Sequence, residues 1–284
     1  MPELPEVEYV RRFLGHAMEG ARIEQVILRR ANLRLPFPAD FAARLEGQTV
    51  VTVARRAKYL IVELSSGDRL VIHLGMSGWF RVLGITGRHR VTYREFAGED
   101  RDALGTHDHV VFELSNGTTV VFTDPRRFGF MKVLTAEQVT TDPGLAVLGP
   151  EPLEPTFSPA VLARAMAGRK TSLKVALLDQ GTVAGLGNIY ACEALHVARL
   201  SPRRRASTIA TRGGQPRPGA AALVSAIRAV LADAIAHQHR SGGEDRFRVY
   251  DHEGDRCPRR RCSGVIKRIV QGGRSTFFCP VCQR

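Results

Sequence analysis

The feature that most constrains the fold of this chain is a set of four cysteines at its carboxyl end. They are Cys257, Cys262, Cys279 and Cys282. The two close pairs are separated by a span long enough for a β-hairpin, with Gly272-Gly273 as its turn. Four thiolates placed in this way surround Zn²⁺ tetrahedrally and leave no position for a water molecule. The spacing therefore predicts one structural zinc ion in a module too small to fold without it.

Two disulfide bonds, or free buried thiols, are the alternatives for these cysteines. Disulfides are typical of secreted proteins, whereas this chain begins with Glu3, Glu6 and Glu8 and is unlike a signal peptide. Metal binding is therefore the favoured interpretation. The fifth cysteine, Cys192, is expected to be a small core residue.

The charge of the chain indicates a polyanionic partner. Its 41 Lys and Arg residues outnumber its 28 Asp and Glu residues, which gives a formal net charge of +13 at pH 7. Such an excess is typical of nucleic-acid-binding proteins, although an anionic membrane surface or a ribosomal-type RNA would also fit it. No run approaches the roughly 18 apolar residues of a membrane span, so we expect no membrane partner.

Hydrophobic periodicity predicts that the first half of the 284 residues is rich in β-strands. Residues 5–15 have the spacing of an amphipathic helix, which Gly15 is expected to end. Short apolar runs follow, separated by turn residues, and predict a β-sandwich. The runs cover residues 23–28, 50–53, 59–64, 70–73, 79–83, 110–114, 119–123 and 128–134. The polar stretch 84–109 is expected to be a surface loop or insertion.

The second half of the chain has a helical pattern. Proline and glycine accumulate over residues 140–159, as in a linker, and Ser158-Pro159 is typical of a helix start. Helices are predicted at residues 159–167, 170–179, 188–197 and 219–238. The arginine-rich stretch 202–218 has the composition of a disordered loop.

The first residues carry the most reactive chemistry in the sequence. If Met1 is removed, Pro2 becomes a secondary amine, and an α-amino group with a pKa of about 7.7 to 8.0 is neutral far more often than a lysine. Such an amine can attack a sugar aldehyde carbon and form an iminium ion, with Glu3 as the nearest proton carrier. The alternative is that this stretch only forms an extended lead into a helix.

Several polar side chains are candidate phosphate contacts. Glycines before Asn188 expose backbone N–H groups that suit a phosphate, and Lys174 lies on the preceding predicted helix. Lys58 stands at the start of a predicted strand. The alternatives are a helix cap for Asn188 and a solvated edge charge for Lys58. Basic residues also surround the cysteines: Arg259, Arg260, Arg261, Lys267, Arg268 and Arg274.

A turn over residues 124–129 has the side chains needed to enter a base stack. Phe128 could act as a wedge, and the guanidinium of Arg126 could fill the space left by an extruded base. Met76, flanked by glycines, could reach the same gap. The alternative for Phe128 and Met76 is the hydrophobic core, the commoner place for such residues.

Taken together, these motifs resemble the bacterial formamidopyrimidine-DNA glycosylases from end to end and in the same order. The matching stretches are residues 2–8, 55–60, 73–78, 124–129 and 185–190 and the four cysteines. The resemblance implies an α+β multidomain protein, with an N-terminal β-sandwich that carries an N-terminal helix, a helix-two-turn-helix domain and a C-terminal β-hairpin zinc finger. It further implies that oxidised purines such as 8-oxoguanine and formamidopyrimidines are excised from duplex DNA, and that the abasic site is cleaved by β,δ-elimination.

The resemblance also implies a role for each candidate residue. Pro2 resembles the nucleophile that attacks C1′, Glu3 the acid that protonates the opening sugar, and Glu6 a residue that supports this site. Lys58 matches a lysine that contacts a phosphate near the lesion and is counted as catalytic. The residues implied to fill the void after base flipping are Met76, Arg126 and Phe128, and those implied to hold phosphates are Lys174, Asn188 and Arg274.

Two departures from the family pattern leave alternatives open. The first cysteine pair encloses four residues where two are usual, and the stretch 239–256 is short where the family has a loop that closes over 8-oxoguanine. A short loop would favour formamidopyrimidines, or the endonuclease VIII branch, which acts on oxidised pyrimidines. A non-catalytic zinc-finger protein that binds damaged DNA is the alternative from another functional class.

The predicted domains are 1–138 (catalytic β-sandwich), 139–157 (linker), 158–250 (helix-two-turn-helix) and 251–284 (zinc finger). We expect a monomer that binds damaged double-stranded DNA, requires no small-molecule cofactor, and is cytoplasmic and associated with the bacterial nucleoid.

Overall fold

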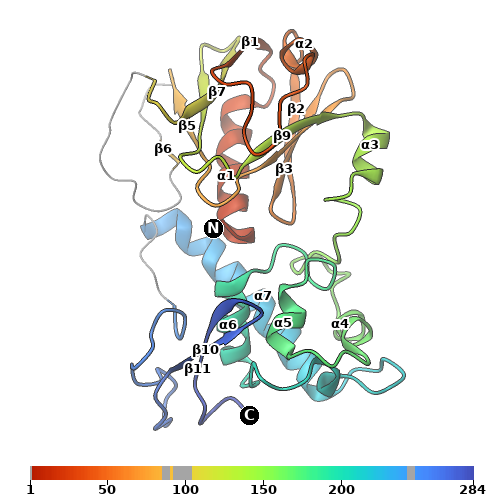
Figure 1. Ribbon diagram of the computed structural model, residues 1–284, viewed down its shortest axis with the longest axis vertical. Coiled ribbons are helices and arrows are strands. Elements are labelled where there is room, and N and C mark those ends of the chain that lie inside the picture. Colours follow the sequence, from red (N-terminus) through yellow and green to blue (C-terminus); the bar gives the residue numbers. More distant parts are fainter. Residues whose placement is uncertain (1, 85–89, 92–103, 242–246) are drawn as a thin grey trace. The chain divides into compact units, whose positions relative to one another are not determined.

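The computed structural model describes residues 2–84, 90–91, 104–241 and 247–284, and Figure 1 shows their arrangement. The chain divides into two compact units, Met1–Ala146 and Val147–Arg284. They are called unit 1 and unit 2 below.

Unit 1 begins with helix α1, Leu4–Met18. Its apolar face, which includes Val7, Val10 and Leu14, is almost completely buried. The prediction that Gly15 ends this helix is wrong, because the helix continues for another turn and buries Ala17 and Met18 as well. Burial of a further apolar turn outweighs the helix cost of one glycine, which is about 1 kcal/mol.

Two antiparallel sheets follow and form a β-sandwich (Figure 1). The five-stranded sheet has the order β1 (Ile23–Leu28), β7 (Asp108–Leu114), β8 (Thr119–Thr123), β5 (Trp79–Leu83) and β6 (Arg90–Val91). The four-stranded sheet has the order β2 (Val50–Arg56), β3 (Tyr59–Leu64), β4 (Arg69–His73) and β9 (Phe130–Leu134). Two short helices, α2 (Phe41–Leu45) and α3 (Ala136–Thr141), complete the unit.

Each of the eight predicted strands is confirmed, with ends that differ by at most three residues. The stretch 84–109 was predicted as a loop, but strand β6 forms within it and β7 begins at Asp108. Residues 85–89 and 92–103 of that stretch lie outside the described residues. A single core unites the sandwich, with Phe80 and Phe122 in ring contact and α1 packed into the same cluster.

Unit 2 contains four α-helices among its described residues: α4 (Pro159–Met166), α5 (Leu173–Leu178), α6 (Asn188–Val197) and α7 (Pro218–Ser241). The predicted cap is confirmed, since the Ser158 hydroxyl accepts a hydrogen bond from the Val161 N–H at 3.3 Å. A short 3-10 helix, η1 (Ala206–Ile209), precedes α7. The hairpin of β10 (Lys267–Gln271) and β11 (Arg274–Phe278) turns at Gly272-Gly273 as predicted, and both glycines have positive φ.

The arginine-rich stretch 202–218 is ordered, so the prediction of disorder is wrong. Ala206 and Ile209 are fully buried there, and the Ala206 N–H donates to the Thr171 carbonyl at 2.9 Å. These two buried apolar side chains hold the loop in place, although most of its arginines are exposed.

Helix α7 is long and apolar enough to cross a membrane by length and composition, over Pro218–His237. The core helix of a soluble protein passes the same test. Only 33% of that apolar window is buried, and it includes Leu223, Ile227 and Leu231, while α7 packs against α4 and α6.

Candidate functional site

The amino-terminal end of α1 has a capping box, in which the buried Glu3 and Glu6 carboxylates each accept a hydrogen bond from the backbone N–H of the other residue. The Glu3 N–H donates to the Glu6 carboxylate at 2.7 Å, and the Val7 N–H donates to the Glu3 carbonyl at 3.1 Å. Glu3 and Glu6 are only 2% and 3% exposed, and Pro2 is buried beside them. The structure thus brings the predicted nucleophile, proton carrier and supporting carboxylate together at one helix end.

A group of ion pairs around Glu8 fixes this helix end against strand β2. The Glu8 carboxylate contacts Arg55 at 3.1 Å, and also Arg11 and Arg12 on its own helix. Burial raises the pKa of Glu8, but hydrogen bonds from the three guanidinium groups outweigh it and hold the pKa below its usual value. At the other end of α1, the Gly20 N–H donates to the Val50 carbonyl at 2.9 Å, so α1 runs antiparallel to β2.

Lys58 lies in the tight turn between β2 and β3, next to this ion-pair group. The turn has Ala57 at φ 52°, and the Arg55 guanidinium donates to the Ala57 carbonyl at 3.0 Å. Lys58 itself is 9% exposed, so it is not the solvated edge charge that was the alternative. Because Arg55 contacts both Glu8 and this turn, the start of α1 and Lys58 lie at the same end of the four-stranded sheet.

The strand register brings two more loops to that end. Tyr59 on β3 is paired with His73 on β4, and His73 is paired with Phe130 on β9. The chain therefore leaves β4 into the loop 74–78 at the same end at which it enters β9 from the loop 124–129. These are the two loops that carry the predicted base-stack residues.

His73 connects the sheet to the first of these loops. Its ring is stacked on Phe130, and its Nδ1 accepts a hydrogen bond from the Gly75 N–H at 3.0 Å. Burial, followed by the nearby charges of Lys58 and Arg34, lowers the pKa of His73 to about 4. The imidazole is therefore neutral at neutral pH, and the Nδ1 lone pair is free to accept this bond.

The two loops are locked to each other through Asp124 and a close glycine contact. One Asp124 oxygen accepts from the Ser77 hydroxyl at 2.5 Å, and the other accepts from the Gly129 N–H at 2.7 Å. Gly75 has φ +63°, and a side chain there would meet the Phe128 carbonyl carbon at 2.3 Å. Only glycine allows the two backbones to approach so closely.

Met76 and Phe128 project from this junction with 40% and 43% of their surfaces exposed. These exposures exclude the core as their place. The Arg126 guanidinium lies 4.7 Å from the centre of the Phe128 ring, and the Arg126 N–H donates to Ser77. The three predicted base-stack residues are thus brought together on the double loop formed by residues 74–78 and 124–129.

In unit 2, the finger hairpin packs against two helices that carry predicted phosphate contacts. The Asn188 side-chain amide, at the start of α6, donates to the Ser275 carbonyl of β11 at 2.9 Å. Gly272 at the hairpin tip lies close to Val175 of α5, next to Lys174. Arg274 is exposed at the start of β11, whereas Lys174 is fully buried.

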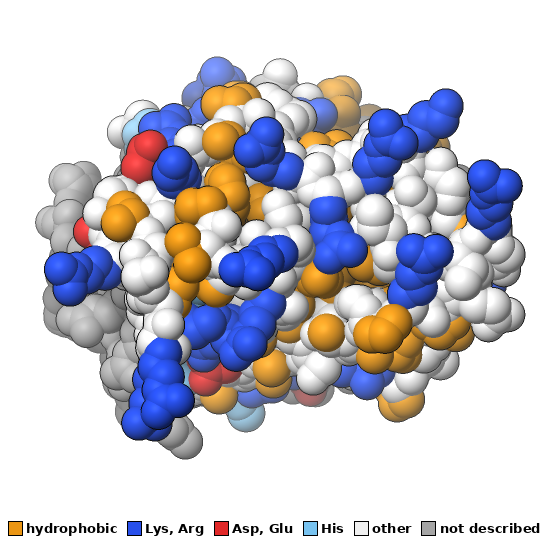
Figure 2. All heavy atoms as spheres, turned by 90° about the horizontal axis from the view of Figure 1, so that it is seen from below, with side chains coloured by type: hydrophobic (Ala, Val, Ile, Leu, Met, Phe, Trp, Pro, Cys, Tyr) orange, Lys and Arg blue, Asp and Glu red, His pale blue; other side chains and the backbone are white. Residues whose placement is uncertain are grey.

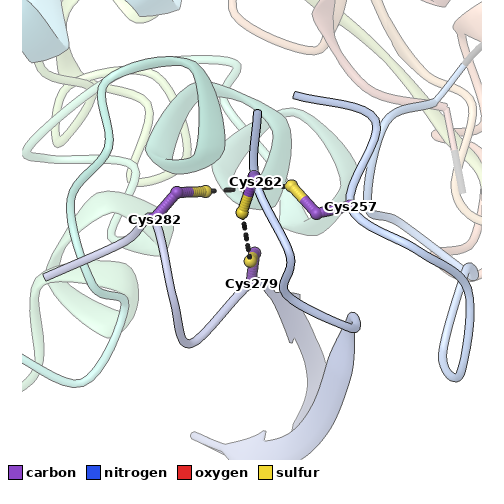
Figure 3. A group of neighbouring side chains, drawn as sticks. All are labelled: Cys257, Cys262, Cys279 and Cys282. Atoms are coloured by element: carbon purple, nitrogen blue, oxygen red, sulfur yellow. Dashed lines mark hydrogen bonds between the residues drawn. The ribbon is translucent and has the colours of Figure 1, made fainter. Parts of the chain in front are cut away.

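The four cysteines converge in the same unit (Figure 3). Their Sγ atoms all lie within 4.8 Å of one another, with 3.8 Å between Cys257 and Cys282 and 3.6 Å between Cys262 and Cys279. A tetrahedral Zn²⁺ with Zn–S bonds of about 2.3 Å requires S···S distances of about 3.8 Å. Burial and the neighbouring thiols raise the pKa of Cys282 to about 12, so a cation is needed before all four can be thiolates.

Three residues of this site were not predicted from the sequence. Arg55 and His73 lie inside stretches that match the family, but no local pattern indicates their role. Ser77 connects two loops that are far apart in the chain. Each acts through a partner that only folding brings near.

Positive charge is spread over one face of the protein. Figure 2 shows a face on which Lys and Arg side chains are widely distributed and few acidic side chains are visible. A face of this kind attracts a phosphate backbone.

Sequence comparisons place family domains along nearly the whole chain. The Formamidopyrimidine-DNA glycosylase N-terminal domain matches residues 1–131, the Formamidopyrimidine-DNA glycosylase H2TH domain matches residues 148–244, and the zinc finger found in FPG and IleRS matches residues 254–284. A formamidopyrimidine-DNA glycosylase of Rhodopseudomonas palustris is 55% identical over 299 residues and covers 100% of both chains.

Solved structures agree with these matches. Formamidopyrimidine-DNA glycosylase of Lactococcus lactis, non-covalently bound to DNA that contains an AP site, is similar with a TM-score of 0.82 at 28% identity. MutM in complex with DNA that contains carbocyclic 8-oxo-G is similar with a TM-score of 0.82 at 29% identity. Each comparison covers 100% of both chains.

Proposed function

Because this chain belongs to the formamidopyrimidine-DNA glycosylase family, we propose that it excises oxidised purines from duplex DNA and cleaves the resulting abasic site through Pro2. It is a DNA glycosylase with abasic-site lyase activity, like the relatives that it matches over their full length. The observation that carries the residue assignment is the buried group of Pro2, Glu3 and Glu6 at the start of α1.

The chemistry requires a nucleophile and a proton carrier in fixed positions. Once Met1 is removed, the Pro2 nitrogen attacks C1′, and the bond from C1′ to the damaged base breaks. Glu3 donates a proton to the sugar ring oxygen as the ring opens, which leaves an iminium ion between Pro2 and C1′. The iminium then accepts the electron pair of the neighbouring C2′–H bond as that proton is removed, and the resulting enamine expels the 3′ phosphate, which leaves with its bonding electrons (β-elimination). Loss of a further sugar proton expels the 5′ phosphate in the same way (δ-elimination). Glu6 holds the Glu3 backbone in place during these steps.

The double loop supplies what base flipping needs. Extraction of a base leaves a gap in the stack that an apolar wedge and a hydrogen-bonding side chain can occupy. We assign Phe128 and Met76 as the wedge and Arg126 as the group that faces the orphaned cytosine. Their shared exposure on this double loop supports this assignment. Lys58, at the same sheet end, is assigned to a phosphate near the lesion.

Unit 2 is assigned to holding the DNA backbone. Arg274, Asn188 and Lys174 are the proposed phosphate contacts. Because Lys174 is fully buried, its contact is the least direct of the three. The protein has one structural zinc ion, and we assign Cys257, Cys262, Cys279 and Cys282 as its ligands. When bound, the ion ties the hairpin that carries Arg274 into a fixed shape.

The protein acts on damaged DNA, in keeping with relatives whose structures contain it. We propose the domain limits 1–138, 158–250 and 251–284 with a linker at 139–157, a monomeric state, and a cytoplasmic location at the nucleoid.

Borohydride trapping tests this function. Duplexes that carry 8-oxoguanine, a formamidopyrimidine, an oxidised pyrimidine or a preformed abasic site are incubated with the enzyme and reductant, and the adduct is located by mass spectrometry. We expect a covalent adduct at Pro2. No adduct on any duplex, with a free Pro2 and bound zinc confirmed, would instead favour a non-catalytic binder of damaged DNA.

The same experiment separates the endonuclease VIII alternative, which the shortness of stretch 239–256 favours. Part of that stretch, residues 242–246, lies outside the described residues. Faster trapping on the oxidised pyrimidine than on either purine lesion would support that branch, and the reverse order supports oxidised purines. A formamidopyrimidine preferred over 8-oxoguanine would agree with a shortened loop.

A further inference from the structure

One buried histidine lies against the cysteine cluster without being one of its ligands. His196, in the last turn of α6, is 2% exposed, and its Nε2 lies 3.4 Å from the Cys257 Sγ. Its other ring nitrogen, Nδ1, has no hydrogen-bond partner among the described residues. Among the described residues, this imidazole therefore has its side-chain hydrogen-bond contact with a cysteine sulfur.

The four sulfur atoms already complete a tetrahedron, so His196 has no place in the first coordination sphere of the ion. A metal-bound thiolate carries no proton and can only accept a hydrogen bond. We propose that His196 is a positioning residue of the zinc centre, which donates its Nε2–H to the Cys257 thiolate. This inference rests on the proposed four-cysteine zinc site.

The unusually long spacing of the first cysteine pair contributes to the same contact. Arg259, within that pair, donates from Nη2 to the His196 carbonyl at 2.7 Å and to the Val197 carbonyl at 3.3 Å. A guanidinium satisfies open carbonyls at a helix carboxyl end and is favoured there by the helix dipole. The Cys262 N–H in turn donates to the Arg259 carbonyl at 3.0 Å. The longer segment between Cys257 and Cys262 thus packs over the carboxyl end of α6.

Helix α6 is consequently attached to the zinc module at both ends. Asn188 at its first turn holds the Ser275 carbonyl of the hairpin, and His196 at its last turn holds the Cys257 sulfur. Four thiolates around Zn²⁺ leave two negative charges on the centre, and an N–H donor offsets part of that charge. Hydrogen-bond partners of metal ligands commonly change metal affinity by roughly 10- to 100-fold.

The first test measures zinc release from the full-length protein to a chromogenic chelator. His196→Phe removes the donor but keeps a buried ring, and His196→Gln keeps a donor. We expect zinc release to be at least about tenfold faster from His196→Phe, and His196→Gln to recover part of the difference. His252→Phe is the matched control, because His252 is an exposed histidine that lies shortly before Cys257 in the sequence and contacts Asp255. Release from His196→Phe at the wild-type rate would overturn the proposal.

Zinc content is measured first, so that a failure of the four-cysteine site can be told apart from a failure of the role of His196. A wild-type protein without zinc would contradict the four-cysteine site, whereas one zinc with unchanged release would contradict only the role of His196.

A second measurement does not depend on any variant folding. In zinc-loaded wild-type protein labelled with ¹⁵N-histidine, NMR identifies which ring nitrogen of His196 carries the proton. The proposal requires a proton on Nε2. A neutral His196 with its proton on Nδ1 alone would overturn it.

Discussion

Burial fixes the position of Glu3 and lowers the pKa of His73, and a single substitution at each residue tests the effect. Glu3 is buried where its backbone is held by Glu6, so its position is fixed by a helix start. His73 is held neutral between Phe130 and the Gly75 N–H. The first arrangement serves the proposed chemistry, and the second serves the shape of the double loop.

Replacing Glu3 by Gln is expected to remove base excision and spare DNA binding. The amide keeps the shape of the side chain but cannot donate a proton to the opening sugar, and loss of a general acid costs roughly 10²- to 10⁴-fold in rate. Single-turnover excision and equilibrium binding to the same lesion duplex measure the two effects. Glu24→Gln, on an exposed residue of β1, is the control. Retained excision in Glu3→Gln would refute the role of Glu3.

Unit 1 is expected to lose stability in acid through His73. Its folded pKa of about 4 lies below the ordinary value of 6.5, so between these values the unfolded chain binds a proton that the folded protein does not. The contribution is fully present above pH 6.5 and is lost as the pH falls toward 4, by at most about 3 kcal/mol.

His73→Gln keeps an acceptor for the Gly75 N–H and cannot be protonated in this range. Urea unfolding at pH 7 and at pH 4.5 should therefore show a smaller loss of stability for the variant than for the wild type. His252→Gln provides the comparison with an exposed histidine. An equal loss in His73→Gln and wild type would show that His73 does not cause the acid sensitivity.

At the scale of structural elements, the double loop depends on one glycine. Gly75→Ala places a methyl group about where the Phe128 backbone already lies, and it also requires a non-glycine residue at φ +63°. Gly67 has a φ of +90° as well, but a side chain there would meet nothing within 4 Å. Gly67→Ala therefore isolates the backbone cost, which is about 1–2 kcal/mol.

We expect Gly75→Ala to lower the free energy of unfolding by more than Gly67→Ala does, and to lower excision of a lesion by at least about tenfold. Gly75→Ala has the larger expected effect because its methyl group would force apart the loops that carry Met76 and Phe128. Urea unfolding and excision kinetics on both variants measure it. Equal effects of the two substitutions would mean that the close approach of the loops has no role.

The whole molecule carries a net charge of +13, so its affinity for DNA should fall steeply with salt. Each neutralised phosphate contributes a slope of about 0.9 in a plot of log K against log salt. Arg274→Gln should reduce this slope by about one, because it removes one cation from a phosphate. Asn188→Ala should weaken binding without a change in slope, because the amide is uncharged. An unchanged slope in Arg274→Gln would exclude Arg274 as a phosphate contact.

Local patterns in the sequence were sufficient to predict the helices and strands and the chemistry of the motifs. Strands β1, β3, β5 and β8 and helix α6 have the predicted limits, because their periodicity and their bounding turns are properties of adjacent residues. The zinc cluster was predictable for a similar reason, since two close cysteine pairs with this spacing are typical of a structural zinc site. Gly15 and the loop 202–218 were mispredicted, because distant apolar contacts decided both.

The sequence by itself determined which side chains were available: an amine and two carboxylates at the start, an arginine two residues before a phenylalanine, and four thiols. Only the tertiary structure decided which of them meet. The strand register brings loops 74–78 and 124–129 to one sheet end, Glu8 and Arg55 place the start of α1 there, and His196 reaches Cys257. Such contacts join residues tens of positions apart, and they form because the whole core must be buried at once, which no local pattern encodes.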